Sequence, residues 1–161
     1  MIVNAQTLLK LSPIKDMEPS KKTLHGVSYG LSEAGYDIRI AQDVLFLGDG
    51  KSCFVDQKEQ FNNRFALASA MEEFTMPDSL VAIVHDKSTW ARRGLSVFNT
   101  VIEPGFFGGL TLELVFHGNS RLFIPKGSGI AQVLFHKITN KARYAGKYNG
   151  QSMNPEPARD G

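Results

Sequence analysis

The sequence predicts a mostly β protein, a sandwich or barrel with one or two short helices. Three observations support this fold class: many short runs of alternating or β-branched residues, glycine- and proline-containing turns between them, and little helical periodicity. The 161 residues are enough to bury one hydrophobic core without disulfides or a structural metal. We therefore expect a single domain over residues 1–161.

The beginning of the chain predicts one helix followed by a loop. Asn4 can cap a short helix over residues 5–11, and Pro13 ends it. Residues 14–34 contain a proline, two glycines and several serines, which favours a loop.

Strict alternation begins with residues 36–40, which predict a strand. Tyr36 and the two isoleucines share one face, while Asp37 and Arg39 share the other. These two charged residues can form an ion pair, and we expect their role to be structural. The following segments are expected to be a strand at 44–47, a turn at 48–50 and a polar loop at 51–63.

The middle of the chain contains one ambiguous segment. The alanines and glutamates of residues 65–74 favour a helix by propensity, but the short length between turns allows a strand. The β-branched run at residues 80–85 predicts a strand. Residues 88–95 predict a short helix, with Ser88 as its N-cap and Gly94 as its stop.

The rest of the chain predicts strands and a polar tail. The expected strands are residues 97–102, 110–116, 121–124 and 130–138. In the second of these, the three leucines and Phe116 share one face, and Thr111 and Glu113 share the other. Residues 149–161 are polar, and we expect a flexible tail unless a ligand or partner orders it.

Composition and charge narrow the functional classes. Charged residues make up 21% of the chain and the net charge is +2, so no nucleic-acid partner is expected. No segment is apolar enough to predict a membrane span or a signal peptide. The single cysteine, Cys53, cannot form an intramolecular disulfide, which suits a reducing cytoplasm; we expect it to be partly buried and without a role.

Several catalytic motifs are absent from the sequence. The four histidines are scattered and no C-x-x-C pair occurs, so the zinc site of nucleoside deaminases is not predicted. There is no Walker loop, no G-x-G-x-x-G after a strand and no G-x-S-x-G nucleophile elbow.

One local pattern suits an anionic ligand. Lys87, Ser88 and Arg92 lie around one expected helical turn, with the serine and the arginine four residues apart on one face. A cation, a hydroxyl and helix N-terminal amides together suit a phosphate. The alternative is a surface helix with a serine cap and solvated basic residues.

Six segments in order resemble the dCTP deaminase and dUTPase superfamily of trimeric, all-β nucleotide enzymes. They are AGYDIR at 34–39, DKSTWARRG at 86–94, IEPGF at 102–106, TLEL at 111–114, GIAQ at 129–132 and YAGKY at 144–148, followed by Gln151. The resemblance implies a dUTPase-like distorted β-barrel or jelly-roll. It also implies a homotrimer with sites at its subunit interfaces, which binds dCTP or dUTP. Mg²⁺ would be carried by the triphosphate, and no zinc would be needed.

The resemblance also implies how protons move. Deamination at cytosine C4 needs an activated water and a proton for the leaving amine. In related deaminases the glutamate of T-L-E-L does both, and it corresponds to Glu113. The alternative is a solvent-facing carboxylate on a half-exposed sheet. Ser88 and Arg92 correspond to residues that position the water and shape the site.

Further positions of these motifs are expected to contact the substrate. They are Lys87, Thr89, Trp90, Ala91, Thr111, Leu112 and Gln132, the last of which needs buried partners or a ligand in its apolar strand. In the tail, Tyr144 and Lys147 correspond to phosphate contacts and Gln151 to a base contact. The alternative for the tail is a basic, flexible C-terminus.

The resemblance is compatible with two enzyme activities and with one non-catalytic function. The spacing of Ser88 and Arg92, T-L-E-L, the Y-x-G-K-Y tail and Phe106 favour a deaminase, which could continue to dUMP. The segment 100–105 is about two residues shorter than in deaminases and approaches the dUTPase pattern. There Glu103 replaces an aspartate that in dUTPases activates the attacking water. The third interpretation is a catalytically inactive trimer that binds a nucleotide or a protein.

Overall fold

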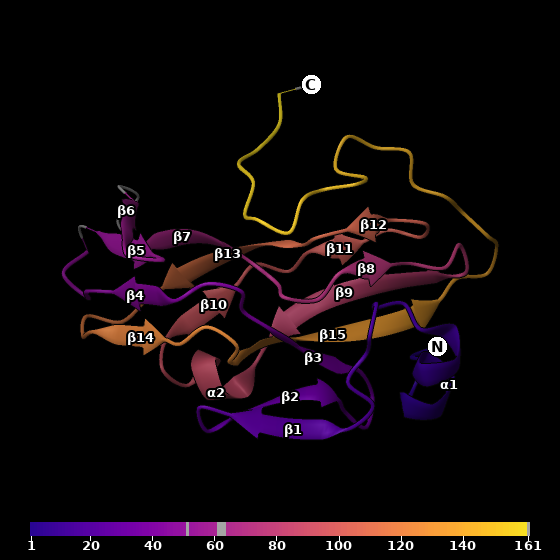
Figure 1. Ribbon diagram of the computed structural model, residues 1–161, viewed down its shortest axis with the longest axis horizontal. Coiled ribbons are helices and arrows are strands. Elements are labelled where there is room, and N and C mark those ends of the chain that lie inside the picture. Colours follow the sequence, from indigo (N-terminus) through magenta and orange to yellow (C-terminus); the bar gives the residue numbers. More distant parts are fainter. Residues whose placement is uncertain (51, 61–63, 161) are drawn as a thin grey trace.

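The computed structural model describes residues 1–50, 52–60 and 64–160, and it is mostly β with two short helices, as expected (Figure 1). The helices are α1 (Ala5–Leu11) and α2 (Ser88–Ala91). The strands are β1 (Lys21–Leu24), β2 (Val27–Leu31), β3 (Tyr36–Arg39), β4 (Val44–Phe46), β5 (Cys53–Val55), β6 (Lys58–Gln60), β7 (Phe65–Ser69), β8 (Phe74–Thr75), β9 (Leu80–Asp86), β10 (Leu95–Val97), β11 (Val101–Ile102), β12 (Phe107–Gly108), β13 (Thr111–Phe116), β14 (Leu122–Ile124) and β15 (Gly129–Lys137). No helix in the described ranges is long and apolar enough to cross a membrane.

Strand pairing divides the described residues among four sheets. The largest has six strands in the order β1-β2-β3-β15-β9-β11, and the others are β10-β13-β7, β14-β4-β5-β6 and the pair β12-β8. In Figure 1 the four-stranded sheet lies at the left end, and the C-terminal tail, in yellow, runs above the strands. Each strand order is open-ended over the described ranges, so the closed barrel is replaced by open sheets that share one hydrophobic core.

The core follows the alternation of the sequence. On β13, Leu112, Leu114 and Phe116 are buried, while Glu113 on the other face is half-buried. The ambiguous residues 65–74 form strands, and β7 pairs with β13 on the side opposite β10. Glu113 therefore stands on the central strand of a sheet, where hydrogen bonds on both edges hold its backbone.

Two expected loops contain β-hairpins instead. Residues 14–34 hold β1 and β2, which are joined at His25 and Gly26, with φ angles of 52° and 75°. Residues 51–63 hold β5 and β6; residues 51 and 61–63 lie outside the described residues. β1 is exposed throughout and β6 nearly so, so neither strand carries the apolar alternation that identifies a half-buried strand.

The region of residues 88–102 differs from expectation in two ways. α2 ends at Ala91, and its N-cap residue is Lys87 rather than the serine. The strand expected at residues 97–102 is broken: β10 pairs with β13, whereas β11 pairs with β9. Residues 98–100 therefore carry the chain from one sheet to another.

Two smaller expectations are corrected by burial and geometry. Asn4 occupies the N-cap position of α1, but its side chain makes no capping hydrogen bond. Cys53 is fully buried rather than partly buried. Burial raises the pKa of its thiol to about 11, so the thiol stays protonated near neutral pH.

Candidate functional site

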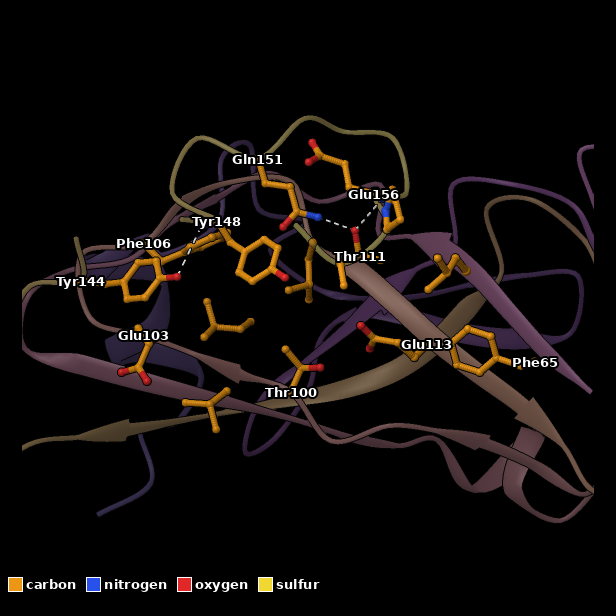
Figure 2. Close-up of a pocket in the computed structure, with 16 residues that line it drawn as sticks. Phe65, Thr100, Glu103, Phe106, Thr111, Glu113, Tyr144, Tyr148, Gln151 and Glu156 are labelled. Atoms are coloured by element: carbon orange, nitrogen blue, oxygen red, sulfur yellow. Dashed lines mark hydrogen bonds between the residues drawn. The ribbon is translucent and has the colours of Figure 1, made fainter. Parts of the chain in front are cut away.

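A pocket of about 580 Å³ lies between β13, the segment after β10 and the C-terminal tail (Figure 2). Five residues that the sequence predicted for the site line it: Glu103, Thr111, Glu113, Tyr144 and Gln151. Most of the remaining wall is apolar and comes from β7, β11 and neighbouring turns. A concave apolar wall with a few convergent polar groups is typical of a small-molecule site.

Glu113 presents the chemically most adaptable group of this pocket. Its carboxylate points into the pocket toward Thr100 in Figure 2. Burial raises the pKa of this carboxyl group above its ordinary value, and hydrogen bonding to its own backbone and to the Thr100 side chain opposes the rise. A carboxyl group with a raised pKa can accept and return a proton nearer to neutral pH.

Thr111 and Gln151 are joined at the upper edge of the pocket. The Gln151 amide donates a hydrogen bond to the Thr111 hydroxyl oxygen, which also accepts the backbone N–H of Glu156 at 3.0 Å. Both residues of the pair are buried. The tail residue predicted to contact a base thus reaches the same strand as Glu113, two positions away.

The tail reaches this position because it passes very close to two glycines. The backbone N–H of Gly109 donates to the Gln151 carbonyl at 2.9 Å, and that of Gly150 donates to the Phe107 carbonyl at 2.8 Å. A Cβ atom added to Gly109 would lie 2.1 Å from the Ser152 carbonyl oxygen, and one on Gly108 would lie 2.6 Å from the Gln151 carbonyl oxygen. Only glycine leaves room for this backbone approach.

We expect Gly109→Ala to release the tail while the core stays folded. The methyl group collides with backbone rather than with a movable side chain, so the 2.1 Å contact forces the tail away. Limited proteolysis should then cleave within residues 141–160 about 10-fold faster than in the wild type. Thr23→Ala on exposed β1 is the control. Unchanged cleavage in Gly109→Ala would contradict this course of the tail.

Glu103 and Tyr144 lie at the other end of the pocket. Glu103 is exposed, and Figure 2 places its carboxylate below Tyr144, away from Glu113. The Tyr144 backbone N–H donates to the Pro104 carbonyl at 2.7 Å, and its ring packs against Phe106 with centroids 6.3 Å apart. The turn and the tail therefore support each other at this end.

Lys147 stands outside the pocket wall but beside it. Its ammonium group donates to the Arg159 carbonyl, and the Arg159 guanidinium donates to the Lys147 carbonyl. Both cations lie near the Tyr148 ring, at 5.4 Å and 5.6 Å from its centroid. Glu156 pairs with Arg159 at 2.6 Å, which leaves Lys147 with a neutral carbonyl partner.

The residues of α2 do not line the pocket that the described part of the chain forms. Ser88, Ala91 and Arg92 are exposed, and Thr89 is half-buried. Figure 1 shows α2 below β10, on the side of the sheets away from the tail. Within one chain, the structure therefore does not bring the serine and arginine motif to Glu113.

Lys87, in contrast to the other polar residues of its motif, is engaged inside the protein. Its ammonium group lies 2.5 Å from the Asp37 carboxylate and 3.0 Å from the Ser28 hydroxyl, and both charged side chains are largely buried. The expected pairing of Asp37 with Arg39 is wrong, because Arg39 pairs with buried Glu72 at 2.9 Å. A buried pair of this kind ties β3 to the start of α2.

Three further predicted contact residues have structural surroundings. The Trp90 indole is buried and donates to the Gly129 carbonyl at 2.7 Å. Leu112 is buried in the core. Gln132, half-buried, donates to the Ser32 hydroxyl at 3.4 Å, which supplies the partner that its apolar strand required.

The sequence did not identify several residues that line the pocket. Thr100 faces Glu113 from the segment between β10 and β11, Phe65 and Leu67 come from β7, and Tyr148 comes from the tail. The short segment 100–105 was the sequence feature that could have identified Thr100 as a pocket residue. No local sequence feature identifies the two β7 residues as pocket residues, since their position depends on the pairing of Leu67 with Glu113 between distant strands.

The donor set for a metal ion is sparse. Among residues 1–50, 52–60 and 64–160 no group of three or more histidine, cysteine, aspartate or glutamate side chains is arranged to hold one. The pocket offers the carboxylates of Glu103, Glu113 and Glu156 at separate places. Carboxylates at separate places do not form the convergent set of oxygen ligands that a Mg²⁺ ion held by the protein alone needs.

Comparison with known proteins gives a family and a fold. Residues 26–138 match a family model described as dCTP deaminase-like. The dCTP deaminase of Campylobacter jejuni subsp. jejuni serotype O:2 is 38% identical over 146 residues, which cover 78% of this chain and 78% of that protein.

Two solved structures share the fold at low sequence identity. The 2′-deoxycytidine 5′-triphosphate deaminase of Agrobacterium tumefaciens has a TM-score of 0.55 at 18% identity, covering 83% of this chain and 47% of that one. The native EIAV dUTPase has a TM-score of 0.53 at 17% identity, covering 86% of this chain and 93% of that one. The open sheets described above are thus a dUTPase-like arrangement.

Proposed function

This chain belongs to the dCTP deaminase-like family of nucleotide-processing enzymes, and we propose that it deaminates dCTP hydrolytically to dUTP without zinc. The observation that carries the proposal is Glu113, a half-buried carboxyl group with a raised pKa that points into a pocket of nucleoside size. The 38% identity to a dCTP deaminase over most of the chain supports the choice of substrate.

In the proposed reaction Glu113 moves protons between water and the base. It takes a proton from the water as the water oxygen bonds to C4, and it delivers this proton to N3, which receives the electron pair of the C4–N3 double bond. It then takes the remaining hydroxyl proton, as the C4 carbonyl forms, and returns it to the amino nitrogen. The C4–N bond then breaks and ammonia leaves. Gln151 contacts the base beside Thr111, and Tyr144 and Lys147 contact the phosphates, on which Mg²⁺ is carried.

We place the completed site at the interfaces of a homotrimer in the cytoplasm. Ser88 and Arg92 are exposed and away from Glu113 within one chain, so a neighbouring copy must supply them. Phe98 and Val101, beside the pocket, are 51% and 54% exposed in the single chain. Exposed apolar side chains next to an incomplete site support an interface there.

Product analysis by chromatography tests the function directly. Purified protein is incubated with Mg²⁺ and either dCTP or dUTP, with matched reactions in EDTA. Conversion of dCTP to dUTP supports the proposal, and further conversion to dUMP makes the enzyme bifunctional. Turnover that is unchanged in EDTA would contradict the role of Mg²⁺. No turnover of either nucleotide would favour a modified pyrimidine or a non-catalytic binding trimer.

The second candidate is hydrolysis of dUTP to dUMP and pyrophosphate. It is favoured by the short segment 100–105 and by the place of Glu103 at the pocket, apart from Glu113. An exposed carboxylate at this end can activate a water for attack on phosphorus.

If this second reaction is the true one, we expect Glu103→Gln to lower dUTP hydrolysis by about 100-fold or more. The amide preserves the shape of the turn but cannot accept the proton of water. Pyrophosphate release measures the rate, and Glu73→Gln, at an exposed surface ion pair, is the control. Full activity in Glu103→Gln would exclude Glu103 as the base.

A further inference from the structure

The segment between β10 and β11 brings a hydroxyl group to Glu113 that belongs to none of the catalytic motifs. Thr100 is half-buried and lines the pocket, and Figure 2 shows its side chain below the Glu113 carboxylate, facing the same space. We propose that Thr100 is a positioning residue, which holds the Glu113 carboxyl group in place for proton transfer through both of its protonation states. This inference rests on the proposed deaminase function.

The backbone on both sides of Thr100 is fixed to the strands that hold the pocket. The N–H of Phe98 donates to the carbonyl of Glu113 itself at 3.0 Å. The N–H of Val84, on β9, donates to the carbonyl of Thr100 at 2.9 Å. The hydroxyl group is therefore carried by a segment with anchors on two sheets, which suits a residue that must keep a fixed position.

The other polar groups of the pocket are engaged elsewhere. Gln151 and the N–H of Glu156 both donate to Thr111, and the Tyr144 hydroxyl accepts the N–H of Tyr148 at 3.4 Å. The Tyr148 hydroxyl accepts a backbone N–H from the tail at 3.2 Å. The Thr100 hydroxyl makes one long hydrogen bond, at 3.5 Å to the Phe98 carbonyl. Among the described residues of this pocket, it is the hydroxyl that interacts with the Glu113 carboxyl group.

Within one chain, no charged group competes with the interaction between Thr100 and Glu113 among the described pocket residues, and the Arg92 guanidinium enters the site only from the proposed neighbouring copy. Glu103 lies at the far end of the pocket, and Glu156, on the tail, is neutralised by Arg159. Neither lysine nor arginine is among the described residues that line the pocket. Within one chain the neutral Thr100 hydroxyl therefore lowers the Glu113 pKa that burial raises. A guanidinium supplied by a neighbouring copy would lower it further.

A threonine hydroxyl suits a carboxyl group that changes its protonation state. It donates a hydrogen bond to the ionised carboxylate, and after a rotation it accepts one from the protonated acid. Valine has the same shape but can do neither, whereas serine can do both. The pair of substitutions therefore separates the hydroxyl from the volume of the side chain.

We expect Thr100→Val to lower kcat for dCTP about 10- to 100-fold, with KM changed less than about 3-fold. The ionised form of Glu113 loses a donor, so its pKa rises and the acid limb of the kcat profile moves to higher pH. Thr100→Ser should restore kcat to within about 3-fold of the wild type. Thr23→Val, on exposed β1, is the control and should behave as the wild type.

Two measurements keep the inference separate from the proposed function. Carbon-13 NMR titration of the Glu113 carboxyl group, in the wild type and in Thr100→Val, measures the pKa without turnover. If the wild type does not deaminate dCTP, the function is wrong, but a shifted pKa still supports the contact. Wild-type kcat and an unshifted pKa in Thr100→Val would overturn the inference. If the valine variant does not fold by circular dichroism, Thr100→Ala replaces it in the same two measurements.

Discussion

Glu113→Gln is expected to reduce dCTP deamination by about 10³-fold or more, with nucleotide binding nearly unchanged. Glutamine keeps the length of the side chain and can still accept the Thr100 hydroxyl, but it cannot take a proton from water. The residue lies half-buried on β13, between two paired strands, so the substitution changes the chemistry and not the backbone. Release of ammonia measures turnover, and calorimetry with dCTP and Mg²⁺ measures binding.

The control for this variant is Glu59→Gln on β6, where the side chain is exposed and outside the pocket. It also removes one negative charge, and it should leave turnover and nucleotide binding at wild-type values. Deamination by Glu113→Gln at the wild-type rate would remove Glu113 from the mechanism. Loss of binding together with turnover would instead make Glu113 a binding residue.

The position of Glu113 could be predicted because it depends on local alternation. A leucine stripe on one face of residues 110–116 fixes which side chains enter the core, and the strand forms as expected, with the glutamate on the other face. The exposed strand β1 was missed for the same reason. All its side chains face solvent, so its sequence carries no pattern that distinguishes a strand from a loop.

The contacts that the sequence could not predict are those that depend on pairing between segments far apart in the chain. Lys87 was expected as a free cation for a phosphate, but it is buried against Asp37, which lies 50 residues away along the chain. Phe65 enters the pocket wall because β7 pairs with β13 in one register. Thr100 faces Glu113 because the chain changes sheets at residues 98–100. Each of these contacts depends on which strands become neighbours, and local composition does not encode it.

The same reasoning applies to the motif that the single chain leaves outside the pocket. Ser88 and Arg92 are exposed on α2, and no described contact within the chain turns them toward Glu113. We therefore expect Arg92→Ala to fold normally but to lose about 100-fold or more in deamination, because in the proposed trimer the guanidinium acts across a subunit interface. The decisive result is the behaviour of mixed trimers.

Mixed trimers that contain both Arg92→Ala and Glu113→Gln chains should recover about a third of wild-type activity. In the proposed assembly each site takes Glu113 from one chain and Arg92 from its neighbour, so a trimer with both kinds of chain has one site of three in which both residues are intact. Co-expression of the two variants with different tags, followed by two-step purification, isolates the mixed trimers for the deamination assay. The two purified variants combined without subunit exchange are the control and should stay inactive. If both residues acted within one chain, every site would lack one of them, and mixed trimers would be as inactive as either parent.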